Sequence, residues 1–251
     1  ILNGSAASWM VDNLINNKGR LNGRVTSEIH LTPLTLRECE EFYQSRGMNL
    51  SRQEITLACM ITGGIPYYMN CFNPKLSLAQ NIDTLFFFFF SKLAEEYDRL
   101  FNSVFDNAEA CMKIVSILSK RHSGFTREEI ARQIGCSPNG DFTKNLKALI
   151  SCDLICKYLP LGYGKREEHY RLVDAFCSFW LHFKENKRIS HTDYWQHHQQ
   201  EQEISVWRGI AFEEMCLRHV LQIKQTLQIA GVASVETAYV SRGEDGGSVG
   251  M

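Results

Sequence analysis

Apolar side chains recur along this chain with two periods, and each period predicts a different kind of element. Spacings of three and four predict helices, and three capping boxes mark where helices begin, at Thr35, Ser51 and Thr126. In each box a hydroxyl residue is followed three positions later by glutamate. We expect the first two of these helices to end near Ser45 and Thr62.

The chain between residues 62 and 101 is predicted to remain helical. One helix begins near Pro66, and another spans roughly 79–101. The second contains five consecutive phenylalanines, Phe86 to Phe90, which cannot all face one core with helical periodicity. We therefore expect part of this run to be exposed, where it is an aggregation liability or a surface for a partner.

Residues 108–173 follow a different order of elements. A helix over 108–120 is followed by a short helix ending at Gly135 and by a third helix. The third helix has its inner face at Phe142, Leu146, Leu149 and Ile150. Two strands, in "LICKYLP" and "HYRLV", then flank a glycine-containing turn. Three helices followed by a β-hairpin are the order of a winged helix-turn-helix.

The remaining segments are predicted more briefly. Asp174 caps a helix whose inner face carries Phe176, Phe179, Trp180 and Phe183, and a polar linker covers 184–203 with a solvated His197-His198 pair. A helix covers about 204–225. A helix from Ser5 to Asn16 precedes a strand over 24–31, and a last strand lies in "ASVETAYV". The predicted fold class is mainly α with small β elements.

Composition excludes few function classes. The 251 residues are 44% hydrophobic and carry 27 basic against 28 acidic side chains, a balance that requires neither nucleic acid nor an anionic membrane. This balance does not exclude a local basic face on the surface. No stretch reaches the ~20 apolar residues of a membrane span. Nine cysteines, none in a CxxC pair, favour reduced and mostly buried thiols of a cytoplasmic protein over a zinc site.

The stretch "TGGIPYYM" has two interpretations. Glycine ends a helix because it tolerates positive φ, and proline suits the first position of the next helix, so Gly63 to Pro66 form a helix–helix corner. On the second interpretation the same corner approaches a ligand, because glycine permits close contact and proline fixes the turn.

Four stretches in order support the second interpretation, namely "NGSAASWM" with "GRLNGR", "IHLTPLTLRECEEF", "TGGIPYYM" with "NIDTLFF", and "WRGIAFEEMCLRHVLQIK". With them the chain resembles the archaeal-type AAA ATPases of the STAND group over nearly its whole length. The resemblance implies a remnant of a P-loop α/β core (1–31), a helical lid (32–105) and a winged helix (106–173). It also implies an aromatic helix with linker (174–202) and the start of a PD-(D/E)xK nuclease-like α/β domain (203–251).

The resemblance also implies site residues. Gly64 and Pro66 match a Gly-x-Pro that approaches adenine, and Ser5 or Asn3 occupies the sensor-1 position. Arg20 and Arg24 fall where the family keeps arginine, for phosphate contact, with a surface role or carboxylate pairing equally open. The intact family uses ATP and Mg²⁺.

Parts of that machinery are absent from this sequence. No GxxxxGK[ST] motif occurs, and "GYGKREE" lacks its spacing and hydroxyl, so we expect neither ATP hydrolysis nor a bound cofactor for this chain alone. Both ends look cut, so we expect a fragment. Glu213 is a metal-ligand candidate of the nuclease-like domain or an exposed helical acid, and we expect no nuclease activity and no metal site.

The predicted winged helix leaves its partner open. Lys144 and Lys147 on its third helix, with Lys165 and Arg166 in the hairpin, are candidates for phosphate contact with DNA. Nearby acids dilute this charge, and such domains also bind proteins or clamp their own chain. Two functions result, a nucleotide-binding switch ATPase and a winged-helix DNA-binding regulator without nucleotide chemistry.

Overall fold

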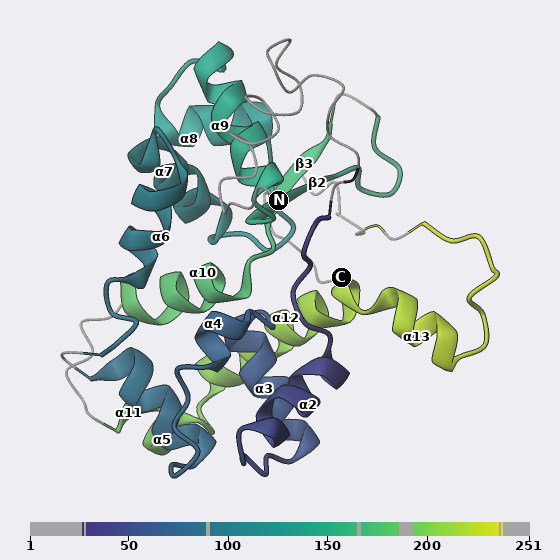
Figure 1. The fold of residues 1–251 in the computed structure, drawn as a ribbon. Coiled ribbons are helices and arrows are strands. Elements are labelled where there is room, and N and C mark those ends of the chain that lie inside the picture. Colours follow the sequence, from purple (N-terminus) through teal and green to yellow (C-terminus); the bar gives the residue numbers. More distant parts are fainter. Residues whose placement is uncertain are drawn as a thin grey trace. The chain divides into compact units, whose positions relative to one another are not determined.

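The computed structural model describes residues 27, 29–88, 91–164, 167–185, 193–235 and 237. Over these residues the fold is mainly helical with one small antiparallel sheet, so the predicted fold class is confirmed. Contacts divide the chain into two compact units, and each is described by itself (Figure 1). The predicted helix from Ser5 to Asn16 lies outside the described residues.

The first unit, called the helical unit, consists of Thr32–Tyr97 and Ala175–Glu236. Figure 1 shows α12, from late in the chain, beside α3, and the contacts agree. Its elements are α2 (Leu36–Ser45), α3 (Arg52–Thr62), α4 (Pro66–Met69), α5 (Leu78–Ile82), the π-helix η2 (Asp83–Phe87), α10 (Ala175–Trp180), the π-helix η3 (Leu181–Glu185), α11 (Tyr194–His198), α12 (Gln202–Arg218) and α13 (Val220–Thr226).

The second unit, called the hairpin unit, contains Asp98–Asp174 with the described residues before Thr32 and with Thr237. Its three strands form an antiparallel sheet in the order β1-β3-β2, in which Phe125 pairs with Tyr170 and Tyr158 with His169. Its elements are α6 (Glu96–Val104), α7 (Ala108–Leu118), β1 (Phe125–Thr126), α8 (Arg127–Ile134), α9 (Gly140–Ser151), β2 (Ile155–Tyr158) and β3 (His169–Leu172). The border between the two units falls within α6.

The helix starts predicted from capping boxes are confirmed. Thr35, Ser51 and Thr126 each accept a hydrogen bond from the backbone N–H of the glutamate three residues on, and that carboxylate accepts from the cap's own N–H. Helices α2 and α3 end at Ser45 and Thr62, as predicted.

The core of the helical unit is an aromatic cluster that joins its two sequence segments. The ring centroids of Phe86 and Phe179 lie 4.8 Å apart, and those of Phe179 and Trp207 lie 5.2 Å apart. The cluster also contains Phe87, Phe176, Phe183, Tyr194 and Trp195, all of them buried.

The single helix predicted over 79–101 is wrong. The chain forms α5, then η2, leaves helical geometry at Phe88 with ψ 148°, and resumes as α6 at Glu96. A regular helix separates neighbouring side chains by about 100°, and the wider π-turn instead lets Phe86 and Phe87 both reach the core. Phe88 is 37% exposed, so partial exposure of the phenylalanine run is confirmed.

The polar linker predicted over 184–203 contains a helix that the sequence did not reveal. Trp195 of α11 is fully buried, although glutamines and histidines surround it in sequence. Asp83 of η2 accepts hydrogen bonds from the backbone N–H groups of Trp195 (2.6 Å) and Gln196 (3.2 Å). A distant carboxylate therefore provides the helix cap that the local sequence lacks. His197 is exposed as expected, whereas His198 is half-buried and stacks on Tyr194.

The helix predicted over 204–225 is interrupted. It ends at Arg218, and α13 begins at Val220 after His219, which has φ −108° and ψ 18°. Both ring nitrogens of His219 form hydrogen bonds with backbone groups.

Two predicted strands are not formed in their described parts. Ile29 and Leu31 of the segment 24–31 are 81% and 87% exposed, and residues 233–235 of "ASVETAYV" are irregular. Alternating side chains form a strand only beside a neighbouring strand, and among the described residues none pairs with either segment. Trp180 and Ile150 are also less buried than predicted, although Trp180 stacks on Tyr97 at 4.3 Å.

All nine cysteines lie in the described residues, and none forms a disulfide. Four are buried, four are half-buried and Cys136 is exposed, so fewer are fully buried than we expected. Across the described ranges, no helix has the length and apolar content to cross a membrane. Within the same ranges, no three His, Cys, Asp or Glu side chains gather as metal ligands would.

Candidate functional site

The Gly63–Pro66 bend connects α3 to α4 through two glycines with positive φ. Gly63 is the C-cap of α3 at φ +66° and donates to the carbonyl of Cys59 at 2.8 Å. Gly64 follows at φ +73°, where a Cβ atom would lie 2.3 Å from the carbonyl oxygen of Leu34. Leu34 N–H donates to the Gly64 carbonyl at 2.9 Å. The backbone before α2 therefore packs so closely on Gly64 that only glycine fits. The predicted helix–helix corner is confirmed.

Pro66 opens α4 at its first position, and the two tyrosines after it point to different environments. Tyr68 is buried and stacks on Phe176 with ring centroids 4.4 Å apart. Pro66 is exposed, and Tyr67 is 49% exposed. The bend therefore presents one proline ring and one tyrosine ring outward on a backbone that the buried tyrosine anchors.

The C-terminal end of α12 contacts the inner side of the bend. Arg218 Nη1 lies 3.4 Å from the carbonyl oxygen of Gly63, and Arg218 Nε lies 4.0 Å from a carboxylate oxygen of Glu214. His219 Nε2 accepts the backbone N–H of Leu36 at 3.0 Å. The bend is thus held from two directions, by the segment before α2 and by α12.

The residues packed behind the bend are suited to packing rather than to acid–base chemistry. The pKa of the Cys59 thiol is raised by its hydrogen bond with Cys39 and by burial, against an opposing effect of Arg218. Burial likewise raises the pKa of the Tyr43 hydroxyl. Thiols and phenols that stay protonated are poor nucleophiles and poor metal ligands. This region therefore presents exposed rings and backbone groups rather than a nucleophile or a metal ligand.

Most of the other predicted nucleotide-site residues lie outside the described residues, namely Asn3, Ser5, Arg20 and Arg24. Lys165 and Arg166 of the hairpin also lie outside them. Glu213 lies half-buried on α12, and the pKa of Cys216 is raised by burial and, to a smaller extent, by the charge of Glu213. Gly64 and Pro66 belong to the helical unit, and Lys144 and Lys147 belong to the hairpin unit.

Helix α9 carries the described nucleic-acid candidates. Lys144 and Lys147 are both exposed and lie three positions apart on the helix. The nearest acid to Lys144 is Asp141, at 3.8 Å between charged atoms, with both side chains more than 80% exposed. Arg127 of α8 fixes the start of α9 by donating to the hydroxyl of Thr143 at 2.6 Å and to the Pro138 carbonyl at 2.9 Å. Lys144 and Lys147 are therefore exposed on a helix whose start is fixed by hydrogen bonds from Arg127.

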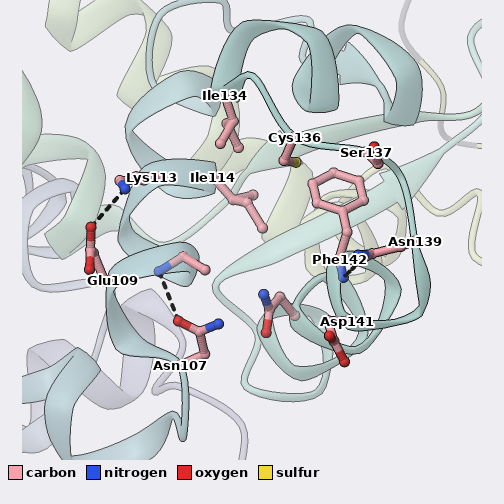
Figure 2. A pocket seen from close by; sticks show the side chains of 12 residues that line it. Asn107, Glu109, Lys113, Ile114, Ile134, Cys136, Ser137, Asn139, Asp141 and Phe142 are labelled. Atoms are coloured by element: carbon pink, nitrogen blue, oxygen red, sulfur yellow. Dashed lines mark hydrogen bonds and ion pairs between the residues drawn. The ribbon is translucent and has the colours of Figure 1, made fainter.

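The hairpin unit also contains a pocket that sequence reasoning missed, with a volume of about 290 Å³. Figure 2 shows side chains of α7 and of the α8–α9 turn around it. Ile114, Ile134 and Phe142 supply apolar lining, and the Glu109–Lys113 ion pair (2.7 Å) lies at one side. The local signal was limited to the helix-capping asparagines, Asn107 and Asn139, which cap α7 and α9 and also line the pocket.

Comparisons with known proteins give one distant similarity. No family model matches the chain, and no solved structure matches it. The chain is similar to an uncharacterized protein of Methanocaldococcus jannaschii, with 25% identity over 185 residues. The match covers 73% of this chain and 40% of that relative, so the chain spans about two fifths of the relative's length.

Proposed function

We propose that this chain is the C-terminal portion of an ATP-binding switch ATPase of the AAA/STAND type. In this proposal residues 32–105 act as the lid, and the bend at Gly64 and Pro66 forms one wall of the adenine site. ATP and Mg²⁺ are then held mainly by a P-loop region that this sequence does not contain, and the protein is cytoplasmic. Binding and hydrolysis of ATP would close and release the lid against a winged helix.

The observation that carries the proposal is the construction of the bend. Gly64 is held at positive φ with no space for a side chain, while the adjoining Pro66 and Tyr67 are exposed on a buried support. A rigid backbone next to outward apolar rings is suited to contact the flat face of a purine. The helix–helix corner alone explains the glycines and the proline, but it does not require exposure of the tyrosine ring.

Nucleotide affinity of the complete gene product tests the proposal. Pro66→Ala removes ring methylenes while keeping a good first helix residue, and we expect it to weaken ATP binding roughly tenfold. Tyr67→Ala is expected to weaken binding at least as much. Pro74→Ala, at another exposed proline of the helical unit, is the matched control and should leave the Kd unchanged. Fluorescence titration with a labelled ATP analogue measures all four proteins.

Two results would contradict the proposal. The complete protein would show no saturable ATP binding, or Pro66→Ala and Tyr67→Ala would both match Pro74→Ala. In the second case Pro66 only forms the helix–helix corner and does not contact the nucleotide.

The order of elements in the hairpin unit favours a second candidate function, a winged-helix DNA-binding regulator without nucleotide chemistry. The helices α7, α8 and α9 and the hairpin strands β2 and β3 occur in succession, with an additional strand β1 that was not predicted, and Lys144 and Lys147 are exposed on α9. The same unit is equally a candidate surface for a protein partner.

Salt dependence separates DNA binding from the other roles. Binding to duplex DNA through these lysines would weaken steeply as salt rises, with a slope that falls by about one for each lysine replaced by alanine. Lys75→Ala, in the helical unit, is the control. Absence of any DNA binding at low salt would contradict this second function.

A further inference from the structure

Three hydrogen bonds connect the end of α12, residues 34–36 and the bend, two of them made by side chains of α12 or its C-cap and one between backbone groups. His219 Nε2 accepts the N–H of Leu36, the first residue of α2, at 3.0 Å. Two residues earlier, Leu34 N–H donates to the carbonyl of Gly64 at 2.9 Å. Arg218, next to His219, lies 3.4 Å from the carbonyl of Gly63. Residues 218–219, 34–36 and 63–64 thus form one continuous network.

The imidazole of His219 is fixed by both of its nitrogens. Because Nε2 accepts from Leu36, the ring proton lies on Nδ1, which donates to the carbonyl of Met215 at 2.8 Å. The ring therefore has one donor and one acceptor role, and each has a partner. Few other side chains can replace it, since the acceptor must reach a helix N-terminus from the end of another helix.

His219 is also the residue at which α12 ends and α13 begins. Its carbonyl accepts the N–H of Ile223 at 2.9 Å, and its own backbone departs from helical geometry. Helix α13 has no buried residue, and Leu221 is 60% exposed. An element with so little burial can change orientation at low cost in free energy. A reorientation of α13 that also changes the backbone angles of His219 would move its ring from Leu36 and Met215 and release the N–H of Leu36.

We propose that His219 is a positioning residue for the bend, through which the orientation of α13 controls the geometry of the Gly64–Pro66 surface. Release of the Leu36 N–H loosens the start of α2 and, two residues earlier, the contact that holds Gly64. The regulatory part of this inference rests on the proposed nucleotide site at the bend. The contact network itself does not depend on it.

Amide hydrogen exchange of this chain, measured by NMR, tests the network. His219→Ala removes the acceptor, and we expect exchange at the Leu36 and Leu34 amides to accelerate roughly tenfold or more. His219→Gln keeps a side-chain oxygen that can accept, so it should restore most of the protection. His197→Ala, an exposed histidine of the same unit, is the matched control and should change neither amide.

The Trp195 amide, bonded to Asp83, serves as an internal reference for the whole helical unit. The inference is overturned if Leu36 alone accelerates, because His219 would then be only a local cap. It is also overturned if Trp195 accelerates as much as Leu34, or if His219→Gln behaves like His219→Ala.

Nucleotide titration separates this inference from the function on which its regulatory part rests. If Pro66→Ala weakens ATP binding and His219→Ala does not, the bend binds nucleotide and the regulatory link fails. If neither variant changes ATP binding while both leucine amides respond to His219→Ala, the proposed nucleotide site fails and the network stands.

Discussion

At the scale of single residues, the corner after α3 was predictable from sequence. The close contact between Gly64 and the backbone of Leu34 was not. Glycine at a helix end and proline at the next helix start have local causes, and both positions were assigned correctly. The approach of the Leu34 carbonyl to Gly64 depends on a segment 30 positions earlier, which no local pattern reveals. The corner was therefore located by sequence, while the contacts that Leu34, Arg218 and His219 make with it or beside it were not, and its role as a site stays a prediction.

Alanine at Gly64 should be far more damaging than alanine at Gly63. Both residues have positive φ, which costs a side chain about 1–2 kcal/mol. At Gly63 the nearest atom is 3.4 Å from the added Cβ, whereas at Gly64 a backbone oxygen lies at 2.3 Å and overpacking adds a further 1–3 kcal/mol or so. Urea unfolding of Gly64→Ala and Gly63→Ala measures the difference, and equal losses would show that the close contact is absent.

A partly buried histidine in the hairpin unit predicts a dependence of stability on pH. Burial, with a smaller effect of Arg171, lowers the pKa of His122 to about 4. The unfolded chain takes up this proton near pH 6.5 and the folded chain only near pH 4, so stability is complete above pH 6.5 and falls as pH decreases towards 4. The loss is at most about 3 kcal/mol.

NMR titration of the His122 imidazole, together with unfolding at several pH values, checks this expectation. A midpoint close to 6.5, or a free energy of unfolding that does not change between pH 6.5 and 4, would contradict it.

At the scale of elements, the ends of a helix were predicted correctly where a local interaction determines them. They were missed where an interaction with a distant residue determines them. Capping boxes placed three helix starts because all of their hydrogen bonds lie within four residues. The break at His219 and the helix α11 were missed because they involve partners far along the chain. For α11 the partner is Asp83, and for the break after α12 it is Leu36.

Replacement of Asp83 should show how strongly that distant cap stabilises α11. The Asp83 carboxylate accepts three hydrogen bonds, from Trp195 N, Gln196 N and Gln196 Nε2, and burial raises its pKa. Asp83→Ala leaves buried donors without an acceptor and should cost about 1–3 kcal/mol. Asp83→Asn keeps one acceptor oxygen, so it should cost less.

Asp106→Ala, at an exposed aspartate, should stay within about 0.5 kcal/mol of the wild type in the same urea measurement. If Asp83→Ala also stays within that range, the carboxylate does not stabilise α11.

At the scale of the whole molecule, the fold class was predictable, whereas the strand β1 of the hairpin unit and the composition of the helical unit were not. The unit borders fall after Tyr97 and after Asp174, and the domain borders expected at 105/106 and 173/174 stay predictions. Residues 175–236 return to pack on residues 32–97 through rings such as Phe86 and Phe179, a tertiary contact without local signature. The assignment of segments to lid, winged helix and nuclease-like domain stays a prediction.

The central claim is that the Gly64–Pro66 bend contacts the base of a bound nucleotide, and photo-crosslinking tests it most directly. The complete gene product is irradiated with ATP that carries an azide on the adenine ring, and labelled peptides are identified by mass spectrometry. The account predicts that the label falls on the peptide containing Pro66 and Tyr67 and that excess ATP suppresses it. Label suppressed by ATP that lies entirely on other peptides would contradict the account.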